Sequence, residues 1–253
     1  MTRHGAASPT HQQADIVSVW DRVAENYTAT ALEGADYQAN LRVILDCVGN
    51  PADRWFCEVG CGSGIMSAEL QKLGAKTVLV DLSLKALSFA REHLANNGLP
   101  AQLCLQNGLQ LGFRDACFDV VWNAGVIEHF RDEGKVVLIK EMYRVVRPGG
   151  MLFVAVPNAL DPPFRLSKLV QQWRGTWKFG YEDDLSPSRL CRLAKRAGLK
   201  DFEVFAYDPI VGWWFLPRGH NVCQALGLNT LAWHLKRSRF GHVVCLSAPK
   251  AKA

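Results

Sequence analysis

The sequence predicts an α/β fold in which one mostly parallel sheet is covered by helices on both faces. Apolar segments of strand length alternate along the chain with segments of helical periodicity, a pattern typical of such sheets. A chain of 253 residues is long enough for one well-packed domain of this kind. In an open parallel sheet, ligands bind beyond the carboxyl ends of the strands, so the residues that follow each predicted strand are the candidates for function.

The first predicted strand, 55–57, runs into a glycine-rich turn with the sequence Glu-Val-Gly-Cys-Gly-Ser-Gly at 58–64, and a helix is predicted over 65–73. Glycine permits positive φ and lets a ligand approach the main-chain amides, while the start of the helix favours negative charge. The turn lacks the lysine of a phosphate-binding P-loop. Ile65 stands where a dinucleotide-binding fingerprint has Gly or Ala, which argues against a nicotinamide dehydrogenase.

The second predicted strand, 77–81, ends in the carboxylate of Asp81, about 20 residues beyond the glycines. A carboxylate at this offset can accept hydrogen bonds from both hydroxyls of a ribose. The alternative is a solvated Asp at the start of a helix over 83–97. The glycines upstream favour the ribose anchor.

The third predicted strand, from 101, ends in a turn at Asn107-Gly108. The side-chain carbonyl of Asn107 can accept a hydrogen bond from an amine of a ligand. Asn-Gly is equally a common turn dipeptide, so both interpretations remain open.

Two further motifs complete the pattern. A fourth strand over 118–123 precedes Val-Ile-Glu-His-Phe at 126–130, and Arg-Pro-Gly-Gly at 147–150 is expected to end a helix and turn into a fifth strand, 151–156. In this order and spacing, the motifs of residues 55–156 resemble those of class I S-adenosylmethionine (SAM)-dependent methyltransferases. The glycine turn and the Glu-His pair are also similar to those of quinone-biosynthesis O-methyltransferases.

The resemblance implies a Rossmann-like, seven-stranded sheet and an enzyme that transfers a methyl group from SAM to a small molecule, most readily to oxygen, leaving S-adenosylhomocysteine. A SAM-binding sensor or partner subunit without catalysis remains the alternative. The residues implied in cofactor binding are Glu58, Gly60, Cys61, Gly62, Gly64, Asp81, Leu82, Asn107, Gly108, Asn123 and Tyr27. Among them, Asn107 stands where the family usually has an Asp that binds the adenine amino group, so the resemblance implies an adenine contact there without the charge.

Catalysis by direct displacement needs alignment first, and a base only for some acceptors. His129 is the expected base, because it follows the fourth strand and histidine changes charge near neutral pH. The alternative is that His129 only caps or packs its helix. Glu128 is the alternative base. Asn158, Trp177 and Tyr181 are expected to contact the acceptor, and no metal site is expected.

The segments outside this core are expected to bind and enclose the acceptor. Residues 1–14 are predicted to be disordered, 15–49 to form an N-terminal cap, 159–184 a substrate-binding insertion, and 208–240 a second variable segment, all in one domain with a core of about 50–158 and 185–250. Within the cap, the Trp20–Tyr27 segment resembles a lid over the cofactor in related methyltransferases. Simple packing of both aromatic residues onto the core is the alternative.

The amino-acid composition indicates which kinds of partner and which cellular location to expect. Eight cysteines without a Cys-x-x-Cys pair are typical of a reduced, cytoplasmic protein. Residues 161–253 carry 15 Lys/Arg against 7 Asp/Glu, together with several tryptophans. This mixture indicates an anionic or lipophilic acceptor and peripheral membrane contact, or an amphipathic helix, 164–173, whose apolar face joins the core. No nucleic-acid partner is expected, and the oligomeric state is not predicted.

Overall fold

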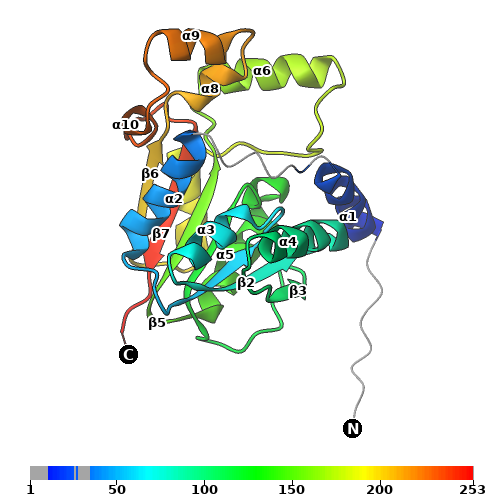
Figure 1. The fold of residues 1–253 in the computed structure, drawn as a ribbon, viewed down its shortest axis with the longest axis vertical. Coiled ribbons are helices and arrows are strands. Elements are labelled where there is room, and N and C mark those ends of the chain that lie inside the picture. Colours follow the sequence, from blue (N-terminus) through cyan, green and yellow to red (C-terminus); the bar gives the residue numbers. More distant parts are fainter. Residues whose placement is uncertain (1–10, 26, 28–34, 253) are drawn as a thin grey trace.

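The computed structural model describes residues 11–25, 27 and 35–252, and its centre is a seven-stranded sheet with the strand order β3-β2-β1-β4-β5-β7-β6 (Figure 1). Strands β1 to β5 run parallel, whereas β7 is antiparallel to both of its neighbours. This confirms the predicted fold class. The strands are β1 (Trp55–Val59), β2 (Lys76–Asp81), β3 (Leu103–Leu105), β4 (Phe118–Ala124), β5 (Val146–Pro157), β6 (Glu203–Tyr207) and β7 (Val243–Pro249).

Helices cover both faces of the sheet. Helices α2, α3 and α4 pack on one face, and α5 and α7 pack on the other. Helix α1 lies against α4, and α6, α8 and α9 lie beyond the ends of the strands, at the top of Figure 1. The helices are α1 (His11–Ala24), α2 (Ala35–Val48), α3 (Ile65–Lys72), α4 (Leu84–Asn96), α5 (Asp132–Val145), α6 (Pro162–Trp173), α7 (Pro187–Arg196), α8 (Val211–Trp214), α9 (Gly219–Ala225) and α10 (Leu231–His234), with a 3-10 turn, η2 (Ile127–His129).

The central strands are apolar on both sides because both faces are covered. In β4, Val121 packs under α5 and α7, while its neighbours Val120 and Trp122 pack under α2 and α3. Successive side chains of a strand point to opposite faces, so a doubly covered strand reads as a continuous apolar run. All eight cysteines are free thiols, and Cys57 and Cys245 lie fully buried in this core.

Helix starts follow the signals in the sequence. The side chain of Ser186 accepts a hydrogen bond from the amide of Arg189, and Pro187 occupies the first turn of α7. Asp161 caps α6 in the same way, accepting from the amide of Phe164.

The Pro-Gly-Gly segment differs from its prediction as a turn. Helix α5 ends at Val145 and β5 begins at once with Val146, so Pro148, Gly149 and Gly150 lie within an irregular stretch of the strand. Gly149 has φ of +76°, and a Cβ on Gly150 would lie 2.5 Å from the carbonyl oxygen of Asp119. The glycines therefore allow a bulge and a close approach to β4.

Two predictions at the ends of segments need correction. Of the stretch 1–14 predicted to be disordered, 1–10 lies outside the described residues, but 11–14 belong to α1. The helix predicted over 164–173 begins at Pro162, because Asp161 caps it there.

The apolar face of α6 does not join the core as a whole. Phe164 is buried, but Leu169, Val170 and Trp173 are exposed, Trp173 to 85%. The helix instead buries the polar side of its second turn, including Lys168, which pairs with acidic residues of the following loop.

Candidate active site

A cavity of about 450 Å³ opens at the carboxyl ends of the parallel strands, between α1 and the α6–α8 region. Its wall brings together eleven of the sixteen candidate residues, whereas Gly64, Asn107, Asn123, Asn158 and Tyr181 lie outside it. The candidates in the wall are Tyr27, Glu58, Gly60, Cys61, Gly62, Asp81, Leu82, Gly108, Glu128, His129 and Trp177.

The glycine turn is tied to the end of β2. The amides of Gly60 and Cys61 donate to the carbonyl oxygen of Val80, over 2.7 and 3.0 Å. The amide of Gly62 donates to Oδ2 of Asp81 over 2.9 Å, and the amide of Ser83 donates to Oδ1 over 2.8 Å. The carboxylate is therefore fixed at the mouth of the turn, with lone pairs left for a ligand.

Two glycines of the turn leave no room for a side chain. A Cβ on Gly60 would lie 2.5 Å from Cγ2 of Val126, and a Cβ on Gly62 would lie 2.9 Å from the Tyr27 hydroxyl oxygen. Gly64 lies outside the cavity wall, where it starts α3 with φ of +67° and packs against Leu79. Its role is the strand-to-helix turn.

Acidic groups in this part of the cavity are disfavoured in their charged form. Burial, with a smaller contribution from the charge of Asp81, raises the pKa of Glu58 to about 8, although the Ser67 hydroxyl donates to it. Burial also raises the pKa of Asp81. The thiol of Cys61 has its pKa raised by burial, so it stays protonated and unreactive. A cationic ligand would favour ionised carboxylates here.

Helix α1 closes one side of the cavity. Asp21 accepts from the hydroxyl of Ser83 over 2.5 Å, and Glu25 pairs with Lys85 of α4 over 2.5 Å. The Trp20 ring meets the His129 ring edge-on, with 4.7 Å between centroids. Trp20 and Tyr27, the two aromatic residues of the predicted lid segment, both line the cavity, and the Tyr27 hydroxyl lies beside Gly62.

The turn after β3 presents a different residue from the one predicted. Oδ1 of Asn107 accepts from the amide of Leu109 over 2.9 Å, so this side chain stabilises the turn itself. Gln106 lines the cavity instead, and its backbone amide donates to the carbonyl of Asp81. The Asn-Gly pattern gave no indication of Gln106, because a side chain's direction at a strand end depends on the turn that follows.

Glu128 and His129 lie side by side in η2, after β4. Glu128 is 2% exposed and its Oε2 has no hydrogen-bond partner among the described residues, and burial raises its pKa to about 8. His129 makes a 2.8 Å hydrogen bond between Nδ1 and the carbonyl of Tyr181. Burial lowers the pKa of His129 to about 4, so the ring is neutral at neutral pH and only a weak proton acceptor.

Three of the remaining candidates serve the framework. Asn123 is buried, with Nδ2 3.3 Å from the sulfur of Met142. Asn158 donates to the carbonyls of Gly241 (2.7 Å) and Arg239 (3.1 Å), which ties the end of β5 to the segment before β7. The Tyr181 side chain is exposed, and only its backbone carbonyl reaches His129.

The far end of the cavity is built from aromatic rings that the sequence motifs did not reveal. Phe164 meets Phe215 at 5.0 Å, His242 at 4.8 Å and Trp177 at 6.4 Å between ring centroids. Trp177 in turn meets Phe179 at 5.3 Å. These residues come from α6, its following loop and the segments around α8 and β7, and no spacing in the sequence relates them.

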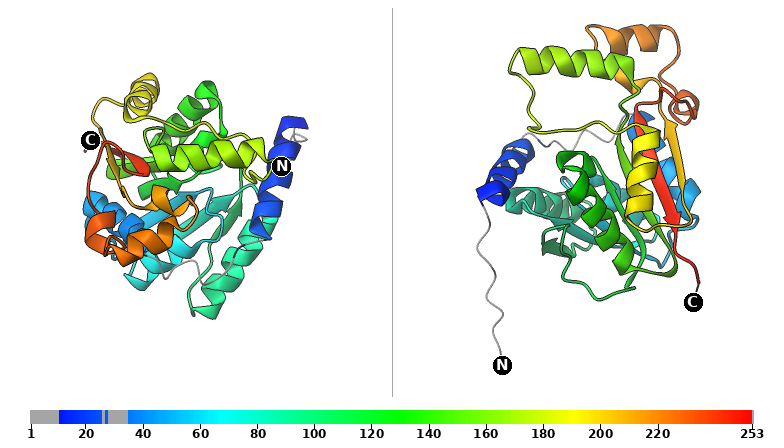
Figure 2. Two further views of the ribbon diagram at one scale, coloured as in Figure 1. Left: turned by 90° about the horizontal axis from the view of Figure 1, so that it is seen from above. Right: turned by 180° about the vertical axis from the view of Figure 1, so that it is seen from behind.

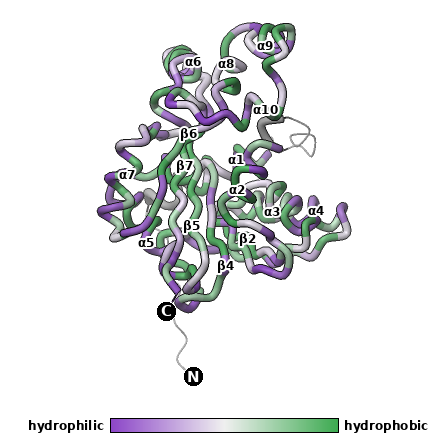
Figure 3. Tube along the Cα trace, turned by 90° about the vertical axis from the view of Figure 1, so that its left-hand side faces the viewer, coloured by the Kyte–Doolittle hydropathy of each residue, from purple (hydrophilic) through white to green (hydrophobic). Residues whose placement is uncertain are grey.

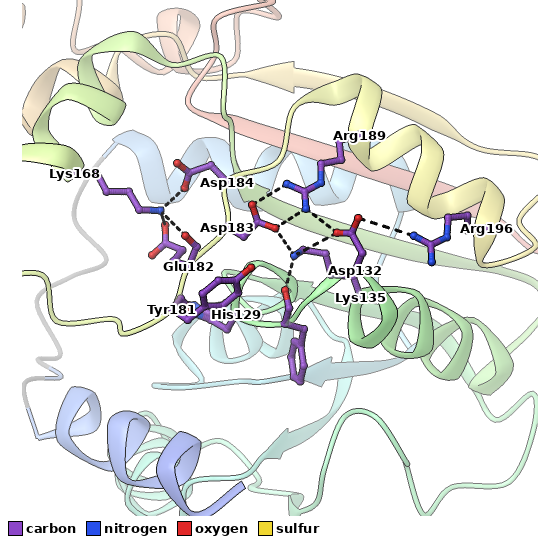
Figure 4. A network of polar contacts seen from close by, with 11 residues as sticks. His129, Asp132, Lys135, Lys168, Tyr181, Glu182, Asp183, Asp184, Arg189 and Arg196 are labelled. Carbon is purple, nitrogen blue, oxygen red and sulfur yellow. Dashed lines mark hydrogen bonds and ion pairs between the residues drawn. The ribbon is translucent and has the colours of Figure 1, made fainter. Parts of the chain in front are cut away.

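A network of ion pairs holds the loop after α6 against η2 (Figure 4). Lys168 pairs with Glu182 (3.0 Å) and Asp184 (2.5 Å), all largely buried. Asp183 binds Lys135 (2.8 Å) and the Arg189 guanidinium. Figure 4 shows two neighbouring groups of contacts, one on Lys168 of α6 and one on Arg189 of α7, which hold the loop that supplies Trp177 and the carbonyl partner of His129.

Comparison with known proteins agrees with this geometry. A methyltransferase domain family matches residues 57–154. The ubiquinone biosynthesis O-methyltransferase of Thiobacillus denitrificans is 32% identical over 162 residues, covering 60% of this chain and 68% of that protein. The protein of the same name from Methylocella silvestris is 26% identical over 242 residues, covering 85% and 94%.

Solved structures show the same fold. A SAM-dependent methyltransferase from Thermotoga maritima aligns with a TM-score of 0.67 at 18% identity, covering 92% of this chain and 99% of that chain. Geranyl diphosphate C-methyltransferase from Streptomyces coelicolor, solved with S-adenosylhomocysteine, aligns with a TM-score of 0.65 at 16% identity, covering 97% and 100%.

The cavity fits the cofactor of these proteins. The two glycines whose Cβ atoms would clash leave a bare main-chain cradle, a carboxylate follows at the end of β2, and the buried Glu58 and Glu128 suit a ligand that carries positive charge. Among the described residues, no group of His, Cys, Asp or Glu is placed to hold a metal ion. The chain belongs to the class I SAM-dependent methyltransferase family and is an enzyme that uses SAM as its methyl donor.

Proposed function

We propose that this enzyme methylates an oxygen atom of a small aromatic acceptor. The observation that carries the proposal is the aromatic end of the cavity, where Phe164, Trp177, Phe179 and Phe215 surround a volume continuous with the cofactor end. Aromatic rings pack well against one another in edge-to-face and offset arrangements. The relatives from Thiobacillus denitrificans and Methylocella silvestris, named ubiquinone biosynthesis O-methyltransferases, support oxygen as the acceptor atom.

The proposed roles in cofactor binding follow from position. Asp81 binds the ribose hydroxyls, the amides of the glycine turn and Leu82 line the cradle, and Gln106 with Gly108 contacts the adenine. Glu58 and Glu128 face the cationic part of the cofactor. When bound, SAM supplies a methyl group made electrophilic by its sulfonium.

Alignment and exclusion of water are the proposed work of the protein. The aromatic end orients the acceptor, and Trp20 and Tyr27 on the other side close the entrance. Holding two reactants in line can account for up to roughly 7–11 kcal/mol of a barrier. Since the aromatic end of the cavity is lined by apolar rings, a bound acceptor there excludes water from the reacting groups.

The experiment that tests the proposal compares matched acceptors. Methyl-labelled SAM is incubated with catechol, phenol and aniline derivatives that carry the same alkyl chain, with the Asp81→Ala variant as the control. The proposal predicts label on the phenols and catechols with the native enzyme only. Label on the aniline series alone would show that the acceptor atom is nitrogen and not oxygen. Binding of S-adenosylhomocysteine without label in any acceptor would favour a SAM-binding sensor.

We also infer that the acceptor is lipophilic and reaches the enzyme at an anionic membrane surface. Helix α6 exposes Leu166, Leu169 and Trp173 between Arg165 and Arg174, and Figure 3 shows hydrophobic positions among hydrophilic ones on these outer helices. Exposed apolar residues flanked by arginine favour a charged lipid surface. No helix in the described part of the chain has the length and hydropathy needed to cross a bilayer.

Vesicle binding tests the membrane contact. The double variant Leu169→Gln/Trp173→Gln should lose binding to phosphatidylglycerol vesicles, while Leu84→Gln should keep it. Leu84 is a matched control, because its exposure of 64% lies between those of Leu169 and Trp173 but it lies on α4. Equal binding by all three proteins, or equal binding to neutral phosphatidylcholine vesicles, would contradict the contact proposed here.

A further inference from the structure

His242 lies in the cavity wall at a position fixed by the sheet. It immediately precedes β7, which pairs with β5, and its carbonyl accepts from the amide of Asn158 over 2.7 Å. Its amide donates to the carbonyl of Asp208 over 2.6 Å. The ring is therefore held at the carboxyl end of β5, next to the end of β4, where η2 begins.

Nδ1 of His242 lies 2.7 Å from Oδ2 of Asp161, and the two side chains are 12% and 4% exposed. An ionised carboxylate only accepts hydrogen bonds, so in the neutral form of the His242 ring this contact places the proton on Nδ1 and the lone pair on Nε2. Among the described residues, none hydrogen-bonds Nε2. Since the ring lines the cavity, Nε2 is the nitrogen left to a ligand.

Asp161 is itself held by its surroundings. Its Oδ1 accepts from the amide of Phe164 at the start of α6, over 3.3 Å. Gly212 packs against the carboxylate so closely that a Cβ there would collide with it. The ring of His242 is in turn packed against those of Phe164 and Phe215, with 4.8 and 5.5 Å between centroids. Position, tautomer and ring orientation of His242 are all determined by these contacts.

A second pair of the same kind shows what is special about this one. His234 and Asp208 lie 2.8 Å apart and are both buried, but Nε2 of His234 is enclosed without a partner among the described residues, and neither residue lines the cavity. That pair has only a structural role. His129 does line the cavity, but its Nδ1 partner is a carbonyl, which carries no charge to stabilise an imidazolium.

We propose that His242 is the general base of methyl transfer and that Asp161 is its positioning residue. The acceptor O–H bond breaks and its proton goes to Nε2 of His242. At the same time a bond forms between the acceptor oxygen and the methyl carbon, and the methyl–sulfur bond breaks with its electron pair left on sulfur. The Asp161 carboxylate stabilises the imidazolium. This inference rests on the proposed oxygen acceptor.

The test uses 4-nitrocatechol, whose ionisation is visible in its absorption spectrum. In the complex with S-adenosylhomocysteine, where no transfer takes place, the native enzyme is expected to shift the bound probe toward its phenolate at a pH where the free probe is protonated. His242→Gln is expected to abolish this shift, Asp161→Asn to reduce it, and His234→Gln to leave it unchanged while lowering the melting temperature.

Turnover supplies the second readout. For His242→Gln, kcat is expected to fall by about 100- to 10,000-fold and to rise with pH as hydroxide replaces the base, with unchanged affinity for S-adenosylhomocysteine. A phenolate shift and a kcat profile like those of the native enzyme in this variant would overturn the proposal. Absence of methyl transfer to any phenol by the native enzyme would instead refute the oxygen acceptor, and the probe spectrum would still decide whether His242 accepts a proton.

Discussion

The amide of Gly62 donates a hydrogen bond to the carboxylate of Asp81, with 2.9 Å between nitrogen and oxygen. The glycine turn after β1 and the acidic end of β2 are thus one structural unit. A ligand that leaves this hydrogen bond intact contacts both the main chain of the glycine turn and the Asp81 carboxylate.

Replacing Asp81 by Asn should weaken cofactor binding because it removes the charge that strengthens each ribose hydrogen bond. Hydrogen bonds to a charged group contribute about 1.5–3 kcal/mol, so the Kd for S-adenosylhomocysteine should rise about 10- to 100-fold. Isothermal titration calorimetry measures this. Asp53→Asn is the matched control, because Asp53 is 91% exposed and pairs only with Lys76 among the described residues. Equal affinity of the two variants would contradict the ribose anchor.

Tyr27→Ala should weaken S-adenosylhomocysteine binding by about 3- to 10-fold, the effect of losing one aromatic contact, with little change in melting temperature. The Tyr27 hydroxyl approaches Gly62 in the cavity wall, and this position is the basis for the proposed lid role. Tyr143→Ala provides the contrast: Tyr143 packs on the core between α5 and the end of β7, so that variant should lose stability and keep affinity. A Tyr27 variant that melts earlier yet binds normally would show packing only.

Binding of SAM near neutral pH should release protons. Glu58 and Glu128 have pKa values of about 8 in the free enzyme, so both are mostly protonated at pH 7. A cation beside them lowers these pKa values, and between about 0.5 and 2 protons should leave per molecule bound. Calorimetry in buffers of different ionisation enthalpy gives the number. Proton uptake on binding would contradict the proposal that Glu58 and Glu128 lie beside the cationic part of SAM. Proton release that is undiminished in Glu128→Gln would contradict the role of Glu128.

Glu128→Gln should raise the melting temperature at pH 8 and above and change it little at pH 5. Because burial raises the folded-state pKa of Glu128 to about 8, its contribution to stability is fully present below its unfolded pKa and is lost as the pH rises through 8. Glu141→Gln should do the opposite: Arg144 lowers the pKa of Glu141, so that carboxylate stabilises the fold above its unfolded pKa. Melting temperatures that change with pH in the same direction in both variants would contradict the predicted opposite effects of the two carboxyl groups on stability.

Features set by local chain chemistry could be predicted from the sequence. The glycine turn, Asp81 and the Glu128-His129 pair follow directly from strand ends, and parallel strands bring their carboxyl ends to one edge. Apart from the earlier start of β5, the predicted strands and most helix starts agree with the structure for the same reason.

Other features depend on contacts between distant segments. Asn158 was expected to orient the acceptor, but the carbonyl groups of Gly241 and Arg239 occupy its amide. Phe215 and His242 enter the cavity from segments some 50 to 80 residues beyond α6's start, without any motif. The prediction that α6 buries its apolar face was wrong, because the pairing of Lys168 with Glu182 and Asp184 turns the polar side of the helix inward.

The most direct test of the account is the formation of S-adenosylhomocysteine from SAM, measured with and without an alkylated catechol. The account predicts product that depends on the catechol, appears in equal amount with the methylated oxygen, and is lost in Asp81→Ala. S-adenosylhomocysteine that forms at the same rate without an acceptor, or no product from an enzyme that binds SAM, would contradict it.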